Sequence, residues 1–172
     1  MGSVNARRLS LAALLLVALG CRPEEPSTPA LPLPPPPATS SDRAPEPDPL
    51  SAEAAAGVIR AYYDAIDHKD YARAYRAWGG EGASSHQTFE SFVRGFAETE
   101  SVKVEIGPPG RIEGAAGSRY VTVPVAIEAK TTRGTTQRFA GTYVLRRSVV
   151  DGATSEQRAW HIDSARISRI GG

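Results

Sequence analysis

Two stretches of the sequence carry side chains that could take part in chemistry. The segment "AYYDAIDHKDYARAYRAW", residues 61–78, contains tyrosines, aspartates and one of the chain's three histidines. Near the other end, His161 and Asp163 stand two residues apart. On a strand both side chains would face the same way, so the carboxylate could orient or charge the imidazole for general acid–base work. The alternative is an exposed strand face.

Composition and spacing exclude several other chemistries. Cys21 is the only cysteine, so no internal disulfide, cysteine-based metal site or thiol catalysis is expected. His161 and Asp163 are only two candidate ligands, whereas a zinc site usually needs three, so we expect neither metal nor cofactor. His68 falls in a hydrophilic turn and His86 in a loop, where both are expected to be solvated. No glycine-rich phosphate loop, G-x-S-x-G elbow or H-E-x-x-H helix is present.

Residues 1–20 have the features of a bacterial lipoprotein signal peptide. Arg7 and Arg8 precede an apolar run that is too short to span a bilayer but fits a secretory signal. The following "VALGC" resembles a lipobox, in which cleavage precedes a cysteine that is then acylated. We therefore predict lipidation of Cys21 by palmitate-type chains and a cell-envelope location, with the protein facing the periplasm or exterior. A plain signal peptide with an incidental cysteine is the alternative.

Residues 21–50 are predicted to be the lipidated cysteine and a disordered tether. Residues 22–50 contain 11 of the 14 prolines, and proline fixes φ and removes a backbone donor. This tether is either a plain spacer or a segment whose "PLPPPP" docks on an aromatic groove. Residues 51–172 then form one domain with 16 basic and 14 acidic residues. Such a small net charge does not indicate nucleic-acid binding.

The first half of this domain has the apolar spacing of three helices. Ser51 is a natural N-cap for the first helix. The pattern is interrupted at "DHKD", resumes, and ends at Gly79–Gly80. The third helix would be capped by Ser84, Ser85 or Thr88. The apolar positions are Val58, Ile59, Tyr62, Tyr63 and Ile66, then Tyr71, Ala74, Tyr75 and Trp78, then Phe89, Phe92, Val93 and Phe96.

From residue 101 onward the apolar period changes to two, which is typical of strands. The expected strands cover 101–106, 111–113, 119–131, 137–147 and 158–170, with an irregular connection at 148–157. Pro124 within the long strand predicts an edge position or a bulge there. The fold class is therefore α+β, with three N-terminal helices packed on a curved antiparallel sheet of about four strands.

The segment "VIRAYYDAIDHKDYARAYRAW", residues 58–78, is similar to the first two helices of the nuclear transport factor 2-like superfamily. That superfamily includes ketosteroid isomerases and SnoaL-like polyketide cyclases. The similar features are an aromatic-rich helix, a short turn ending in an aspartate, here Asp70, and a second helix. The order of elements extends the resemblance over residues 51 to about 170. It implies a cone-shaped, cystatin-like fold that encloses a pocket, and a possible homodimer.

The resemblance also implies candidate site residues. In ketosteroid isomerases a tyrosine on the first helix donates to the substrate oxyanion, and Tyr62 occupies that position when counted back from Asp70. Those enzymes also need an aspartate base after the second helix, where this chain has only Glu81 and no base that can be aligned. A ligand pocket in the cone would be lined by Tyr62, Trp78 and Phe92.

Three functions remain open at this stage. The favoured one is a membrane-anchored envelope lipoprotein with a non-catalytic binding or accessory domain that contacts another envelope protein. By resemblance, similar domains precede the catalytic parts of some penicillin-binding proteins. The second is a small apolar or aromatic ligand-binding protein, and the third is an isomerase- or cyclase-type enzyme that uses the cone pocket. No nucleic-acid partner is expected.

Overall fold

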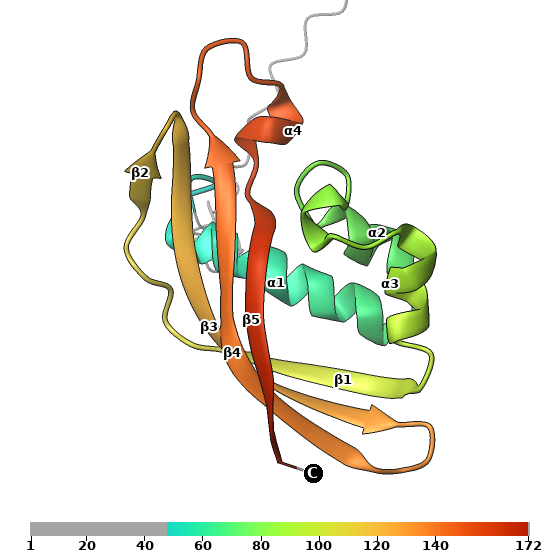
Figure 1. Ribbon diagram of the computed structural model, residues 1–172. Coiled ribbons are helices and arrows are strands. Elements are labelled where there is room, and N and C mark those ends of the chain that lie inside the picture. Colours follow the sequence, from blue (N-terminus) through green and yellow to red (C-terminus); the bar gives the residue numbers. More distant parts are fainter. Residues whose placement is uncertain (1–47, 172) are drawn as a thin grey trace, which may run out of the picture. The chain divides into compact units, whose positions relative to one another are not determined.

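The computed structural model describes residues 48–171, so the predicted signal peptide, Cys21 and nearly all of the predicted tether lie outside the described residues. The helices are α1 (Ala52–Asp67), α2 (Tyr71–Arg76), the 3-10 helix η1 (Ala83–Ser85), α3 (Phe89–Gly95) and α4 (Ser155–Arg158). The strands are β1 (Thr99–Ile106), β2 (Glu113–Ala115), β3 (Ser118–Thr131), β4 (Thr136–Ser148) and β5 (His161–Gly171). The helices α1, α2 and α3 lie on one side of a curved sheet (Figure 1). Within this range, no helix has the length and apolar character needed to cross a membrane.

The "DHKD" interruption separates α1 from α2 as the sequence predicts. The predicted N-cap Ser51 is confirmed, because its hydroxyl accepts a hydrogen bond from the Ala54 N–H at 3.1 Å. α1 ends at Asp67, and Lys69 takes a positive φ of 60° that no helix can continue. Asp70 then caps α2 by accepting from the Arg73 N–H at 3.1 Å. The aspartate that ends the turn is therefore the start signal of the second helix.

The second helix is shorter than predicted, since α2 ends at Arg76 and not at the glycine pair. Two backbone hydrogen bonds to β5 explain the difference. The Ile162 N–H donates to the Ala77 carbonyl at 2.8 Å, and the Gly79 N–H donates to the Ile162 carbonyl at 2.9 Å. These bonds hold residues 77–79 beside β5, where Trp78 forms a bridge with Ile162. Tertiary pairing overrides the helical spacing of Trp78.

The third helix begins at Phe89, and Thr88 is the cap among the three candidates. The Thr88 hydroxyl accepts from the Ser91 N–H at 3.2 Å. Phe92 points into the core and is 2% exposed, whereas Phe89 remains 45% exposed. The predicted apolar stripe is therefore only partly buried on α3.

The sheet is antiparallel with the strand order β1-β3-β4-β5, and the short β2 pairs only with β3. The sheet thus has four long strands plus one short one, where about four were predicted. Ala116 and Gly117, with φ of 45° and 73°, form the two-residue turn between β2 and β3. On β3 the predicted apolar face is confirmed, because Val121, Val123, Val125 and Ile127 are all buried.

Pro124 lies neither on an edge strand nor at a bulge, contrary to the prediction, because β3 runs between β1 and β4 and pairs with β4 in regular register there. Its carbonyl accepts from Gly107 at 2.9 Å, one residue after β1 ends at Ile106. The N and C=O of a strand residue point to the same side, so the proline nitrogen faces the side that β1 has just left. No ladder donor is lost there.

The connection between β4 and β5 contains α4, although the sequence predicts an irregular segment. Thr154 and Gln157 form a reciprocal capping box, with the hydroxyl accepting at 3.2 Å and the amide oxygen accepting at 3.0 Å. The capping signal is present in the sequence, but no apolar periodicity accompanies it. The helix therefore escapes a search based on apolar spacing.

One glycine sets the spacing between β4 and β5. A Cβ at Gly141 would overlap the backbone carbonyl of Arg166 on β5, which cannot rotate away. Gly57, on α1, has no neighbouring atom within 4 Å of the position where its Cβ would lie. Gly57 therefore serves as a control position for a substitution at Gly141.

We expect Gly141→Ala to lower the free energy of unfolding by about 2 kcal/mol or more, because the strands must separate. Gly57→Ala should raise it by about 0.5–1 kcal/mol through helix propensity. Urea denaturation followed by circular dichroism measures both. A neutral Gly141→Ala would show that the strands are not this close.

Candidate functional site

The three residues predicted to line a cone pocket are packed against one another. Tyr62, Trp78 and Phe92 are only 4%, 9% and 2% exposed. The ring centroid of Tyr62 lies 6.2 Å from that of Trp78 and 6.3 Å from that of Phe92. Both distances fall within the range of favourable aromatic pairs. At these three residues the space between helices and sheet is filled by their own side chains.

Two further tyrosines join this group, which we call the aromatic cluster: Tyr62, Tyr63, Trp78, Phe92 and Tyr143. The hydroxyls of Tyr63 on α1 and Tyr143 on β4 are hydrogen-bonded at 2.7 Å in the buried interior. Burial raises the pKa of all three tyrosines, Tyr62, Tyr63 and Tyr143, far above the ordinary value for tyrosine. These phenols therefore stay protonated across the physiological range.

The cluster offers donors but no buried base. Among residues 48–171, the buried polar or charged side chains outside the tyrosines are Ser118 and Thr131, and neither is an acid or a histidine. Glu81, the only acid between α2 and α3, is exposed and has a positive φ of 56°. Tyr62 therefore has no proton-abstracting partner in the interior.

The indole N–H groups of Trp78 and Trp160 are buried without a hydrogen-bond partner among the described residues. An unpaired buried donor costs about 1–3 kcal/mol. Trp78 thus combines tight packing with an unused polar group. Because Trp78 belongs to the aromatic cluster, that unused donor lies in the interior.

A separate apolar pocket of about 230 Å³ lies next to the cluster, and we call it the Phe139 pocket. Tyr63 belongs to both the pocket and the cluster. The other lining residues come from α3, the turn that follows it and the four long strands: Gly95, Phe96, Thr99, Val102, Ile127, Ala129, Gln137, Phe139 and Ile167. Its walls are mostly apolar, and Gln137 and Thr99 supply polar groups. The pocket can hold a small apolar molecule.

The second candidate pair, His161 and Asp163, lies at the start of β5. The carboxylate beside the imidazole belongs to Glu156 on α4, with 3.2 Å between Nε2 and Oε1. The other ring nitrogen, Nδ1, lies 3.1 Å from the Ala159 carbonyl. Both ring nitrogens thus face acceptor oxygens. A neutral imidazole can donate to only one of them, whereas the imidazolium can donate to both.

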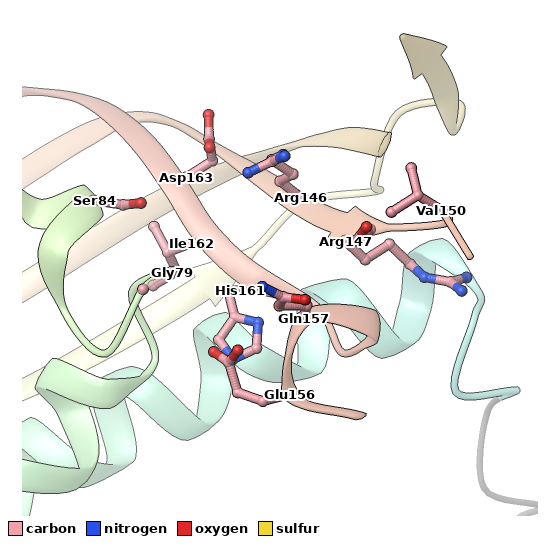
Figure 2. A pocket seen from close by; sticks show the side chains of 12 residues that line it. Gly79, Ser84, Arg146, Arg147, Val150, Glu156, Gln157, His161, Ile162 and Asp163 are labelled. Atoms are coloured by element: carbon pink, nitrogen blue, oxygen red, sulfur yellow. The ribbon is translucent and has the colours of Figure 1, made fainter. Parts of the chain in front are cut away.

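Asp163 does not contact His161 in this arrangement, because a β-bulge separates them. Val144 pairs with Ser164 and Leu145 pairs with Ile162, so Asp163 is an extra residue in β5. A bulge re-aims side chains that regular alternation would place on one face. Figure 2 shows the two side chains pointing away from one another. Within the described chain the Asp163 carboxylate makes no ion pair or side-chain hydrogen bond.

His161 and Asp163 nevertheless line the same polar pocket, which we call the β5 pocket (Figure 2). Its volume is about 230 Å³. The lining residues are Gly79, Gly80, Ser84, Arg146, Arg147, Ser148, Val150, Glu156, Gln157, His161, Ile162 and Asp163. The pocket therefore gathers two arginines, two carboxylates and one histidine.

Two arginines of this pocket could not be placed from the sequence. Arg146 is the register partner of His161, and its Nε donates to the hydroxyl of the buried Ser118 at 3.0 Å. Arg147 lies over the Trp160 ring at 5.7 Å, and its Nε donates to the Arg158 carbonyl at 3.1 Å. Only the strand register brings Arg146 to β5, and apolar alternation does not encode that register across a bulge.

The other titratable candidates lie on the surface. His68 is exposed in the turn after α1, with Nδ1 2.8 Å from the Asp64 carbonyl. His86 is also exposed, with a positive φ of 55°. Within residues 48–171, no group of three or more histidine, cysteine or acidic side chains is placed to hold a metal ion.

Solved structures with a similar chain path come from several bacteria. A candidate aromatic ring hydroxylase from Novosphingobium aromaticivorans is 14% identical, with a TM-score of 0.50 over 74% of this chain and 96% of that one. A candidate dehydratase of the nuclear transport factor 2-like family from Streptomyces avermitilis is 16% identical, with a TM-score of 0.47 over 70% and 97%. A nuclear transport factor 2-like protein from Salmonella enterica serovar Typhimurium is 12% identical, with a TM-score of 0.48 over 70% and 92%.

No protein-family model matches this chain, and no curated protein matches it significantly. At identities of 12–16% the structural matches concern the fold alone. The order of helices followed by an antiparallel sheet is the α+β fold predicted from the sequence, and the Novosphingobium protein shares that fold at a TM-score of 0.50. The activities named for those proteins are theirs and are not carried over with the fold.

The Tyr63–Tyr143 hydrogen bond gives a test of the filled interior. Tyr63→Phe should destabilise the protein by about 1–3 kcal/mol, because it leaves the Tyr143 hydroxyl buried and unpaired. Tyr143→Phe should do the same, and the double variant should cost less than the sum of the two. Urea denaturation of the three variants measures this coupling. Additive effects would show that water reaches the hydroxyls.

Proposed function

We propose that this protein is a lipid-anchored component of a bacterial cell envelope whose cone-shaped domain binds a partner without catalysing a reaction. The packing of the domain interior is the observation that supports a non-catalytic role. Tyr62 is packed by Trp78 and Phe92, and no buried acid or histidine accompanies it among residues 48–171. An isomerase or cyclase that abstracts a proton needs a base within hydrogen-bond reach of its substrate.

The anchor is supported by the sequence of the first 21 residues. A basic start and a short apolar run lead to "VALGC", which ends in Cys21, the only cysteine of the chain. Each acyl methylene that enters the bilayer contributes about 0.8 kcal/mol, so several chains on Cys21 would make release from the membrane slow. The proline-rich tether would then hold the folded part away from the bilayer at up to about 3.1 Å per residue.

In this arrangement the binding partner is another envelope protein. An aromatic interior that is already filled stabilises the fold and leaves recognition to the outer surfaces and the pockets at the periphery. A tethered domain also finds membrane neighbours at a raised effective concentration.

A small apolar ligand is the second candidate partner, and the Phe139 pocket favours it. This pocket lies beside the cluster and not within it, and its walls include Phe96, Phe139 and Ile167. Its volume of about 230 Å³ is below the range of drug-sized sites, which begins at about 300 Å³. Any ligand would therefore be small.

The lipid anchor is tested by replacing Cys21, the residue proposed to be acylated. Wild-type protein should incorporate labelled palmitate and fractionate with membranes, and globomycin should block its processing. Cys21→Ser should abolish labelling and release the protein to the soluble fraction. Thr28→Ser, a change in the tether that leaves Cys21 in place, should behave like the wild type. Membrane association of Cys21→Ser would contradict the proposal.

The Phe139 pocket is tested by filling it. Ala129 lines the pocket, whereas Ala126 is exposed on the opposite face of the same strand. We expect naphthalene, a small apolar fluorescent probe, to bind the wild type and the Ala126→Trp variant equally. Ala129→Trp should reduce the binding at least about tenfold, because the indole occupies the space. Equal binding by both variants would exclude this pocket as the site.

A further inference from the structure

The β5 pocket contains an arginine held ready for a ligand. The Arg146 Nε donates to Ser118 Oγ at 3.0 Å, and Ser118 is itself 2% exposed. This bond holds the guanidinium group of Arg146 in place through its Nε atom. The remaining N–H groups of Arg146 have no protein partner in the described part of the chain, and no carboxylate lies within ion-pair distance of it there. Guanidinium groups bind carboxylates through paired N–H donors.

The same pocket contains an unpartnered carboxylate. The β-bulge turns Asp163 out of the alternation of β5, and its side chain is half-buried without an ion pair in the described residues. In Figure 2 the guanidinium of Arg146 extends towards the part of the pocket where Asp163 lies. Both side chains line the β5 pocket, and no ion pair joins them. A carboxylate in such a position binds a cationic group.

The three other titratable side chains of the pocket, His161, Glu156 and Arg147, already have contacts. His161 Nε2 lies 3.2 Å from Glu156 Oε1. Arg147 is directed to Trp160 and the Arg158 carbonyl. Arg146 and Asp163 are therefore the two charged side chains of the pocket that have no charged or aromatic partner among residues 48–171.

From these charges we infer that the β5 pocket binds a small zwitterion, meaning a ligand with both a carboxylate and an ammonium group, such as a free amino acid or a short peptide. The inference rests on the proposed binding function and names a ligand class for it. The ligand carboxylate meets Arg146 and the ammonium meets Asp163. A simple anion such as phosphate would face Asp163 and Glu156, and a simple cation would face both arginines.

The size and walls of the pocket fit such a ligand. A volume of about 230 Å³ corresponds to roughly eight water molecules at about 30 Å³ each. The absence of a side chain at Gly79 leaves space in one wall of the pocket. A Cβ there would come within 3.1 Å of Ser84 Oγ and 3.8 Å of His161 Cβ. Ser84 and Gln157 add uncharged hydrogen-bonding groups. The pocket therefore combines two unpaired charges with neutral donors and acceptors.

The test compares three probes on the full-length protein at constant ionic strength. Glycylglycine carries both charges, sodium acetate carries the anion alone and methylammonium chloride carries the cation alone. Isothermal titration calorimetry at pH 7 should give glycylglycine a dissociation constant at least about threefold lower than either single-charge probe, a difference set by exposed ion pairs. Acetate or methylammonium binding as tightly as glycylglycine, or no saturable glycylglycine binding, overturns the inference.

Two variants with matched controls assign the binding to this pocket. Arg146→Gln and Asp163→Asn should each weaken glycylglycine binding about threefold or more. Arg166→Gln and Asp151→Asn change exposed residues outside the pocket lining and should leave the affinity unchanged. Arg146→Gln also removes the Ser118 contact, so thermal melting checks its fold. Asp163→Asn loses no contact within the described chain and decides the matter alone.

Failure of this inference can be told apart from failure of the proposed function. Palmitate labelling, membrane fractionation and apolar-probe binding do not involve Arg146 or Asp163. If glycylglycine does not bind while those results stand, only the zwitterion inference is overturned. Unchanged glycylglycine affinity in Asp163→Asn also overturns it, because the ammonium group would then be bound elsewhere.

Discussion

The hydrogen bond between the hydroxyls of Tyr63 and Tyr143 is the contact on which the rest of the structure depends. It joins α1 to the middle strands of the sheet at 2.7 Å, deep in the aromatic cluster. Tyr62, Trp78 and Phe92 pack around it, so α1, the segment after α2, α3 and β4 all meet there. A buried polar pair of this kind tolerates little displacement, because either hydroxyl alone would be left unpaired. The position of α1 relative to β4 is therefore fixed at this point.

The order and type of the main elements could be predicted from the sequence because local signals and tertiary packing agree. The Ser51 and Thr88 caps, the interruption at residues 67–70 and the buried face of β3 all appear where the pattern places them. The differences arise where tertiary contacts prevail. Residues 77–79 leave the helix because Ile162 on β5 supplies their hydrogen-bond partners, and α4 forms by capping alone.

The candidate site was harder to predict, because side-chain direction depends on details that alternation does not carry. His161 and Asp163 were expected to face the same way on a regular strand, but a bulge lies at Asp163, and the carboxylate beside the imidazole is that of Glu156 on α4. Arg146 reaches the pocket only through its register with His161. Tyr62, Trp78 and Phe92 do lie together as the resemblance implies, but they fill the interior with their own rings. Helical spacing predicts which residues face inward and does not say whether a void remains between them.

The last strand of the sheet has a consequence for how copies of this protein behave beside each other. In the described chain β5 pairs on one side with β4, and on its other side only the bridge between Trp78 and Ile162 covers it. The remaining edge is a row of backbone groups that another strand could extend. Arg166 and Arg169 stand along that edge and are exposed. Two such edges brought together would oppose their own positive charges, so crowding on a surface need not lead to fibrous aggregation.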